Sequence, residues 1–221
     1  YRPRGGPGIA ILHGNHLVLG GRACPGRLWF RLPCGGGLDI LLDPAPDRRA
    51  CRRALDKLVD RQPAKIGLPE ISPLPERRYL PSLRIAAFGE GPELTGLGAL
   101  AAAMGIELVT YDKDRLTLGR TAEGCQLDPW TAALLLFHDH EWELPLLEQA
   151  LASEAFYIGA QGGENARIAR TLALTERGVP EERIARIRSP IGLIPSCKAP
   201  QALALSALAE MDAAPALTWL I

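Results

Sequence analysis

The stretch that decides the fold is residues 84–114, "RIAAFGEGPELTGLGALAAAMGIELVTYDKD". It holds an apolar run, a glycine-containing turn, a helix-forming segment closed by Gly105, and a second apolar run that ends at Asp112. Strands that alternate with helices in this way are typical of a parallel sheet covered by helices. The alternation continues along the chain, so residues 83–221 are predicted to form a Rossmann-like α/β domain.

The turn after the first strand follows the logic of a dinucleotide-binding site. Gly89 would permit a tight turn, and Gly91 would let a diphosphate approach the backbone at a helix N-terminus. Asp112 lies 21 residues after Gly91, about where a ribose-binding carboxylate belongs. However, Glu90 and Glu93 place negative charge at the position meant for phosphate. A nucleotide site and a scaffold that has lost this role therefore both stay open.

A second polar cluster follows the apolar run at residues 132–137. His138, Asp139 and His140 are predicted at the carboxyl edge of the sheet, where open α/β sheets bind ligands. Alternation would point the two histidines to one side and Asp139 to the other. Asp139 is thus a candidate binding residue, with capping of the next helix as the competing interpretation.

The N-terminal part has a different pattern. Residues 9–42 contain short apolar runs separated by glycine-rich turns, which predict a small, mostly antiparallel β domain over residues 1–61 that ends in a helix starting near Asp47. Within "RLPCGGGLDILLDP", residues 31–44, Cys34 precedes Gly35 and Gly36. The thiol is either exposed beside bare backbone amides or is a small residue entering a hairpin. Residues 62–82 carry five prolines and are predicted to be an interdomain connection.

Composition and charge limit the classes of function. Residues 1–80 hold 14 Lys and Arg against 7 Asp and Glu, whereas residues 81–221 hold 11 against 18. This asymmetry suits two domains that attract each other, or an N-terminal domain that attracts an anionic ligand. No basic run with interleaved aromatics predicts nucleic-acid binding, and no apolar run is long enough to predict a membrane span. Five widely spaced cysteines without a Cys-x-x-Cys motif favour reduced thiols, a cytoplasmic location and no structural zinc site.

Four stretches together resemble the XdhC/CoxI family of accessory proteins for xanthine dehydrogenase and related molybdenum hydroxylases. They are "RLPCGGGLDILLDP", "LRIAAFGEGPEL…GIELVTYDKD", "FHDHEWELPLLEQALASEAFYIGAQGG" and "RIRSPIGL…APQALALSALAEM". The resemblance is strongest from Ala155 onward, where Tyr157-Ile158-Gly159 and Ser189-Pro190-Ile191-Gly192-Leu193 keep the family pattern.

The resemblance implies a cytoplasmic, dimeric chaperone that has no turnover of its own. Such a protein would hold molybdenum cofactor, as molybdopterin or its cytidine dinucleotide form, during its sulfuration and insertion into a hydroxylase apo-subunit. A cysteine desulfurase is a further candidate partner. The implied cofactor-binding residues include Cys34, whose thiolate would be a soft ligand, with Gly35, Gly36 and Gly159 near the cofactor.

Departures from the family pattern keep an alternative open. The usual Gly-Ala-Gly-His turn is Gly89-Glu90-Gly91-Pro92 here, and the later Gly-Ser-Arg is Gly162-Gly163-Glu164. Each change removes a group that could hold phosphate or ribose. The competing class is an NAD(P)-dependent oxidoreductase built on the Rossmann half, although the sequence shows no convincing hydride-transfer residues.

Overall fold

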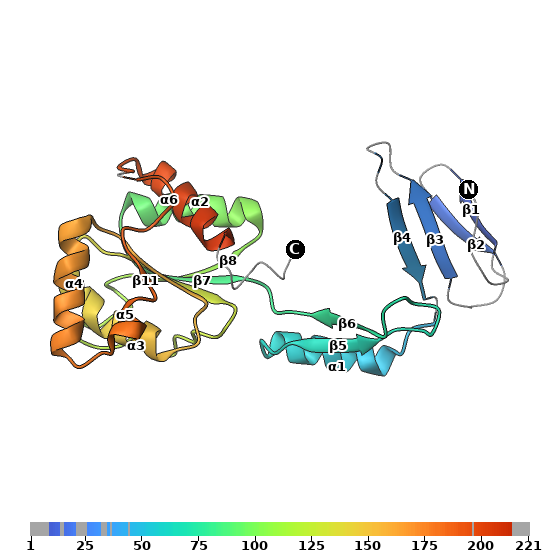
Figure 1. The fold of residues 1–221 in the computed structure, drawn as a ribbon, viewed down its shortest axis with the longest axis horizontal. Helices are drawn as coiled ribbons and strands as arrows, with labels where there is room; N and C mark the ends of the chain where they lie inside the picture. Colours follow the sequence, from blue (N-terminus) through green and yellow to red (C-terminus); the bar gives the residue numbers. More distant parts are fainter. Residues whose placement is uncertain are drawn as a thin grey trace. The chain divides into compact units, whose positions relative to one another are not determined.

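The computed structural model describes residues 9–13, 16–20, 26–31, 35, 37–43, 45–195 and 197–213; over residues 9–31 and 37–39 it describes the backbone alone. The chain divides into two compact units, Tyr1–Pro81 and Ser82–Ile221 (Figure 1). No helix among the described residues is both long and apolar enough to cross a membrane.

The first unit begins with two antiparallel hairpins. β1 (Ile9–His13) pairs with β2 (His16–Gly20), and β3 (Gly26–Arg31) pairs with β4 (Gly37–Leu42). The predicted antiparallel strands are confirmed, as separate two-stranded sheets. Helix α1 (Arg48–Val59) begins where expected because the Asp47 carboxylate accepts hydrogen bonds from the first backbone N–H groups of the helix.

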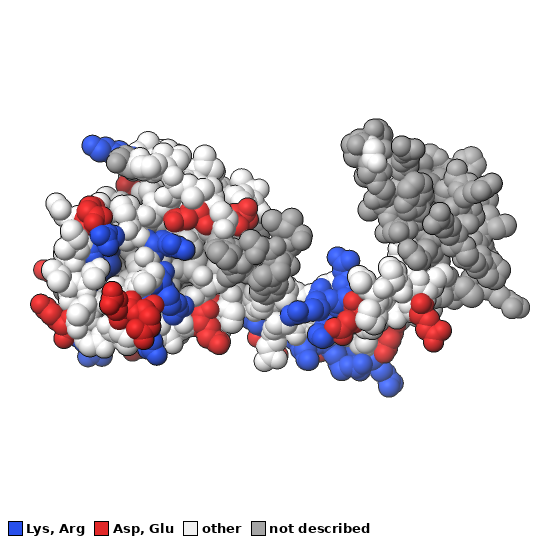
Figure 2. Space-filling view, in the orientation of Figure 1, with Lys and Arg blue, Asp and Glu red and all other residues white. Residues whose placement is uncertain are grey.

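A third hairpin completes this unit and lies within residues 62–82, the stretch predicted to be an interdomain connection. β5 (Ala64–Gly67) pairs antiparallel with β6 (Glu76–Tyr79), and β5 packs against α1. The prolines did not prevent the pairing because Pro69, Pro73 and Pro75 lie in the turn, where a missing backbone N–H removes no ladder hydrogen bond. Lys and Arg side chains gather over α1 and this hairpin (Figure 2).

The second unit contains a five-stranded parallel sheet, as predicted. Its order is β11-β10-β9-β7-β8, formed by β7 (Arg84–Gly89), β8 (Glu107–Tyr111), β9 (Thr131–Leu136), β10 (Tyr157–Ala160) and β11 (Ile187–Arg188). The chain moves outward from β7 in one direction to β8 and in the other to β9. The topological switch point of this doubly wound sheet therefore lies between β7 and β9.

Helices cover both faces of the sheet (Figure 1). One layer is α2 (Pro92–Met104) and α6 (Pro200–Asp212); the other is η1 (His140–Trp142), α3 (Glu143–Ala152), α4 (Glu164–Glu176) and α5 (Glu181–Ile184). Alternate residues of β7 enter the two cores: Ile85 packs with the α2–α6 layer and Phe88 with the α3–α4 layer. Burial on both sides explains why the central strands read as continuous apolar runs.

Candidate functional site at the carboxyl edge of the parallel sheet

The loops that follow the parallel strands meet at the carboxyl edge of the sheet. This is where ligands bind in open α/β folds. The turn after β7 contains Gly89 and Gly91, the segment after β9 contains His138–His140, and the turn after β10 contains Gly162 and Gly163. These three segments define the candidate site, and each has a different chemistry.

The turn after β7 has the predicted glycines. A Cβ at Gly89 would lie 2.8 Å from the backbone carbonyl carbon and oxygen of Leu136, so glycine is needed for close packing of β7 against β9. Gly91, with a φ of 90°, is the N-cap residue of α2. Close packing against β9 thus explains the glycine at position 89, and the positive φ at the start of α2 explains the glycine at position 91.

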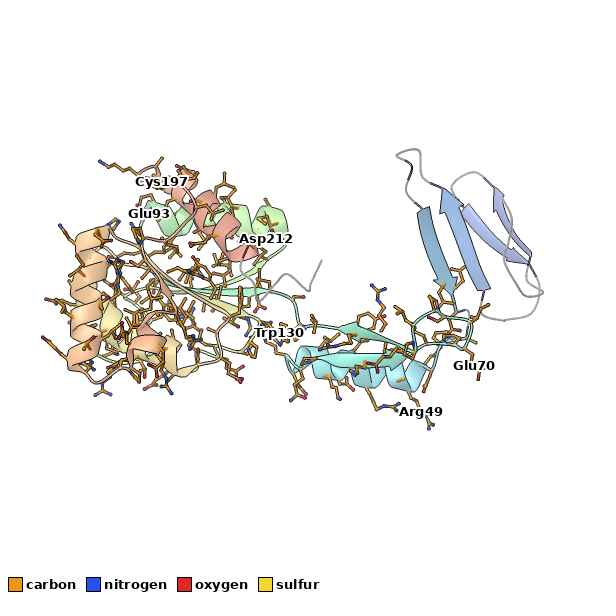
Figure 3. The ribbon with its side chains drawn as sticks, in the orientation of Figure 1. Arg49, Glu70, Glu93, Trp130, Cys197 and Asp212 are labelled. Carbon is orange, nitrogen blue, oxygen red and sulfur yellow. The ribbon has the colours of Figure 1, made fainter. Side chains whose placement is uncertain are left out.

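A carboxylate occupies the start of α2. Glu93 is 8% exposed in the first turn of that helix (Figure 3). Its Oε2 atom is buried, without a hydrogen-bond partner in the described residues, and lies 3.5 Å from Nε2 of His138. A phosphate placed at this helix N-terminus would meet a buried negative charge.

The acids flanking this turn have local partners. Glu90 forms a 2.8 Å ion pair with Lys113, and this bond raises the pKa of the Lys113 ammonium. Asp112, the predicted ribose-binding residue, accepts a hydrogen bond from the backbone N–H of Arg115 at 3.1 Å. The structure therefore shows Asp112 stabilising the turn after β8.

The segment after β9 separates its three polar side chains. Asp139 caps η1, because its Oδ1 accepts from the backbone N–H of Glu141 at 3.2 Å. The capping interpretation is confirmed. His138 lies beside Glu93 at the switch point, whereas His140 contacts Glu143 at the start of α3.

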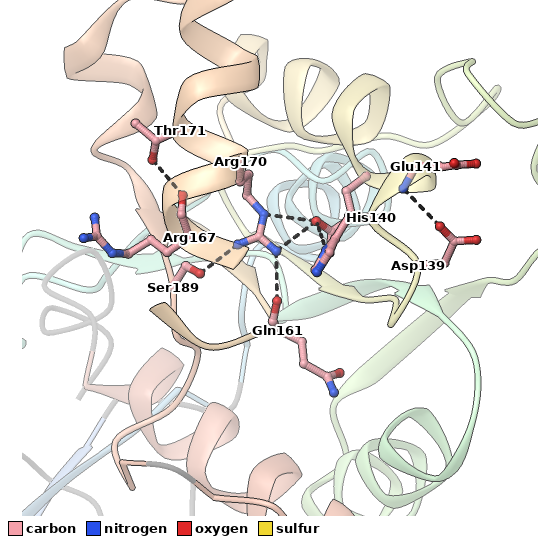
Figure 4. A network of polar contacts seen from close by, with 9 residues as sticks. Asp139, His140, Glu141, Gln161, Arg167, Arg170, Thr171 and Ser189 are labelled. Atoms are coloured by element: carbon pink, nitrogen blue, oxygen red, sulfur yellow. Dashed lines mark hydrogen bonds and ion pairs between the residues drawn. The ribbon is translucent and has the colours of Figure 1, made fainter. Parts of the chain in front are cut away.

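A buried ion pair organises the region around His140 (Figure 4). Arg170 on α4 is 5% exposed and Glu143 is 1% exposed. Nε and Nη2 of Arg170 donate to Oε2 of Glu143 at 3.0 and 2.8 Å. The same guanidinium donates to the backbone carbonyl of Gln161 and to Oγ of Ser189, each at 2.8 Å. The Arg170 guanidinium thus connects α4 to the start of α3 and to the segments that follow β10 and β11.

The same carboxylate orients His140. Nδ1 of His140 lies 3.0 Å from Oε2 of Glu143. Because a carboxylate only accepts hydrogen bonds, this contact makes Nδ1 the protonated nitrogen and leaves Nε2 as the ring atom that can meet a ligand. The His140 ring also lines a pocket on the α4 side of the edge.

That pocket has a volume of about 620 Å³ and lies at the N-terminus of α4. Its lining includes His140, Gly162, Gly163, Glu164, Asn165 and Ala166. The first backbone N–H groups of a helix have no intrahelical acceptor and favour negative charge. A Cβ at Gly162, where φ is 121°, would lie 2.7 Å from Cβ of Ala166, so only glycine fits there. This turn can therefore receive an anion, although Glu164, paired with Arg167, adds a negative charge at its rim.

Gly159, which is predicted to bind cofactor, packs closely against neighbouring side chains in the structure. A Cβ there would lie 2.6 Å from Cδ1 of Ile191 and 2.7 Å from Cε1 of Tyr157.

The loop after β11 is fixed to α6, because Glu210 accepts from the Gly192 backbone N–H at 2.7 Å and from the Tyr157 hydroxyl at 2.5 Å. Burial, and secondarily this bond, raises the pKa of Tyr157.

The remaining predicted residues belong to the first unit. Cys34 and Gly36 lie outside the described residues, whereas Gly35 is exposed with a φ of 87°. Sequence reasoning did not assign the Arg170–Glu143 pair or the pocket at α4. The available signal was the Gly162-Gly163 pair between a strand and a helix, the same arrangement that singled out Gly89 and Gly91.

The fold and the site together define a doubly wound Rossmann-like domain. Its turn after β7 contains a buried carboxylate, and its turn after β10 lines a pocket. Residues 85–211 match the family model of the XdhC Rossmann domain, and the chain belongs to that family. It is 32% identical over 206 residues to the molybdenum cofactor insertion chaperone PaoD of Escherichia coli K12. That alignment covers 84% of this chain and 63% of PaoD. The chain thus spans somewhat less than two thirds of the length of this relative.

The fold is also similar to a crystal structure described as that of a xanthine dehydrogenase from Bacillus halodurans. The TM-score is 0.61 at 18% identity, and the match covers 89% of this chain and 79% of the other. At this identity the likeness supports the fold alone.

Proposed function

We propose that this protein is an accessory chaperone that binds molybdenum cofactor as cargo. It supports sulfuration of the cofactor and its insertion into the apo-subunit of a xanthine dehydrogenase-type molybdenum hydroxylase. The observation that carries the proposal is the 32% identity, over 84% of this chain, to a molybdenum cofactor insertion chaperone. A cysteine desulfurase as sulfur donor and a homodimeric state belong to the same proposal.

The pocket at α4 suits the anionic end of such a cargo. It is largely open to solvent and has a volume of about 620 Å³, enough for a phosphate group and its attached atoms. Backbone N–H groups at a helix N-terminus bind phosphate, and the unprotonated Nε2 of His140 can accept a hydrogen bond from an O–H or N–H group of the same cargo. Both the molybdopterin form and the cytidine dinucleotide form of the cofactor carry phosphate, so the pocket is compatible with either.

Cys34 remains our candidate ligand for the metal–sulfur end of the cofactor. A thiolate is a soft donor suited to such a centre, and consecutive glycines expose backbone amides beside it. The alternative, an NAD(P)-dependent oxidoreductase, is less well supported. It needs a diphosphate at the start of α2, where Glu93 is buried, and a ribose at Asp112, which accepts from Arg115.

The decisive experiment is to identify the small molecule that co-purifies with the protein. The full chain is produced in cells that make molybdenum cofactor, and the retained pterin is oxidised to a fluorescent derivative and quantified. We expect phosphorylated pterin on the wild type, much less on Cys34→Ala, and an unchanged amount on Cys51→Ala, a matched cysteine on α1. His140→Ala is expected to lower retention as well.

The outcomes separate the parts of the proposal. A wild-type protein without pterin would contradict the function itself. Equal retention by Cys34→Ala and the wild type would remove Cys34 from the site but leave the function in place. Tight NAD or NADP binding that Asp112→Ala abolishes would favour the oxidoreductase. Transfer of the retained cofactor to a hydroxylase apo-subunit, measured as recovered hydroxylase activity, tests insertion.

A further inference from the structure

Glu93 is a buried carboxylate that the anion pocket at α4 does not use. Its Oε2 atom accepts no hydrogen bond within the part of the chain that the structure describes, and the Nε2 atom of His138 lies 3.5 Å from it, at ion-pair distance. A buried polar atom without a partner is destabilising, more so when it is charged. Most buried polar groups in proteins are satisfied, so an exception at a ligand-binding edge needs an explanation.

The missing donor cannot come from the protein interior. On its inner side Glu93 borders a cavity of only about 10 Å³, lined otherwise by apolar side chains that include Leu97, Leu134 and Leu203. His138 approaches from outside, but its Nε2 stays 3.5 Å from Oε2, beyond ordinary hydrogen-bond length. A donor that satisfies Glu93 must therefore arrive from the open side of the edge.

The open side leaves room for a donor to approach. The His138 side chain is 68% exposed, so it can move without disturbing the core. Gly91 has no side chain, and a Cβ there would lie 3.5 Å from Oε2 of Glu93. Glu90 in the same turn is neutralised by Lys113. The group that approaches must carry N–H or O–H donors, because phosphate or carboxylate would be repelled.

We propose that Glu93 binds the amino-pyrimidinone edge of a pterin, the edge formed by the exocyclic 2-amino group and the adjacent ring N–H. A carboxylate accepts two parallel N–H donors, and a planar edge with two adjacent donors matches that geometry. This inference rests on the proposed function and assigns the other end of the same cargo. The pterin edge lies at α2, and the phosphate lies at α4.

The sheet topology supports this division. β7, which leads into α2, and β10, which leads into α4, both neighbour β9. Two strand spacings separate them, which is about 10 Å along the edge. That separation suits a fused pterin ring system with a short phosphorylated side chain, with its donor edge at one turn and its anion at the other.

The test compares two probes that differ at the edge in question. Pterin carries the 2-amino group, whereas lumazine has an oxo group in its place. Binding of each to the full chain is followed by probe fluorescence or titration calorimetry. We expect the wild type to bind pterin about tenfold more tightly than lumazine, the discrimination of one good bidentate contact. The Glu93→Gln variant loses or reverses this preference, because a carboxamide offers one donor and one acceptor.

Two further measurements separate binding from structure. Thermal unfolding of Glu93→Gln is expected to shift to higher temperature, because the variant removes a buried charge whose Oε2 atom accepts no hydrogen bond. Glu90→Gln, an exposed acid of the same turn, is expected to keep the pterin preference. If Glu93 had only a structural role, the Glu93→Gln substitution would not change the preference of the protein for pterin over lumazine.

The outcomes are distinguishable from those of the proposed function. Equal binding of pterin and lumazine by the wild type, or an unchanged preference in Glu93→Gln, overturns the subsite. If the wild type still retains cofactor from cells in that case, the chaperone function stands. If it neither retains phosphorylated pterin nor binds either probe, both proposals fail.

Discussion

The turns that follow β7 and β10 are built alike but differ in what they can hold. Each is a glycine-containing link from a parallel strand to a 13-residue helix at the same edge of the sheet. After β7, the first acidic residue of the helix, Glu93, is buried at the N-terminus of α2. After β10, the first acid, Glu164, is exposed and paired with Arg167, and a pocket of about 620 Å³ remains. Glycine spacing therefore locates such a turn, while the next side chains decide its chemistry.

A buried cation explains part of this difference. Nη2 of Arg170 donates a hydrogen bond to the backbone carbonyl of Gln161 at the start of the turn after β10, which fixes the backbone there. Within the described residues, the turn after β7 has no buried Lys or Arg. The Lys113 that pairs with Glu90 in this turn is about one-third exposed. The two turns should thus respond to different substitutions.

The largest effect is expected from Arg170→Ala. It leaves the carboxylate of Glu143 buried without its cation, which typically costs about 3–5 kcal/mol of unfolding free energy. Urea denaturation measures the change. Arg167→Ala, one turn earlier on α4 and exposed, is the matched control and should unfold like the wild type. A small loss for Arg170→Ala would mean that the ion pair does not hold the turn. Recovery in Arg170→Met combined with Glu143→Leu would support the mechanism.

A smaller effect is expected from adding one methyl group to each turn. Gly89→Ala places a Cβ against the backbone of Leu136 and should lower the unfolding free energy by about 1–3 kcal/mol. Gly163→Ala meets no atom within 4 Å and has a φ of −79°, so it should be tolerated. Chemical denaturation of both variants makes the comparison. Equal stabilities would contradict the view that the first turn is closely packed and the second is open.

The sequence predicted those strands and helix caps that depend on residues close together along the chain. The run "AALLLF" predicted β9 correctly because a strand that is buried on both faces is continuously apolar. Asp139 offered two interpretations; the structure confirms the cap, and cofactor binding by Asp139 stays a prediction. The β5–β6 hairpin was missed because its pairing depends on packing against α1 rather than on a periodic pattern.

The site was harder to predict because its key contacts are distant along the chain. Arg170 and Glu143 are 27 residues apart, and no spacing rule connects them. Burial of Glu93 follows from the packing of α2 on the sheet, so the sequence could place its charge at the turn but could not show that its Oε2 atom accepts no hydrogen bond. Asp112 was predicted from its spacing and Gly159 from the family resemblance. The structure shows a local hydrogen bond at the first and close packing at the second, and cofactor binding by either stays a prediction.

The smallest predicted effect concerns the rim of the pocket at α4. The Glu164 carboxylate lies at the helix N-terminus, and its bond to Arg167 lowers its pKa, so it stays charged at neutral pH. Glu164→Gln removes that charge and should tighten binding of inorganic phosphate by roughly threefold, the effect of one solvent-screened charge nearby. Amide chemical shifts of Gly163 and Asn165 during a phosphate titration report the binding, and added salt should reduce the gain. Shifts at Gly91 and Leu94 instead would place the anion at α2 and reverse the comparison between the two turns.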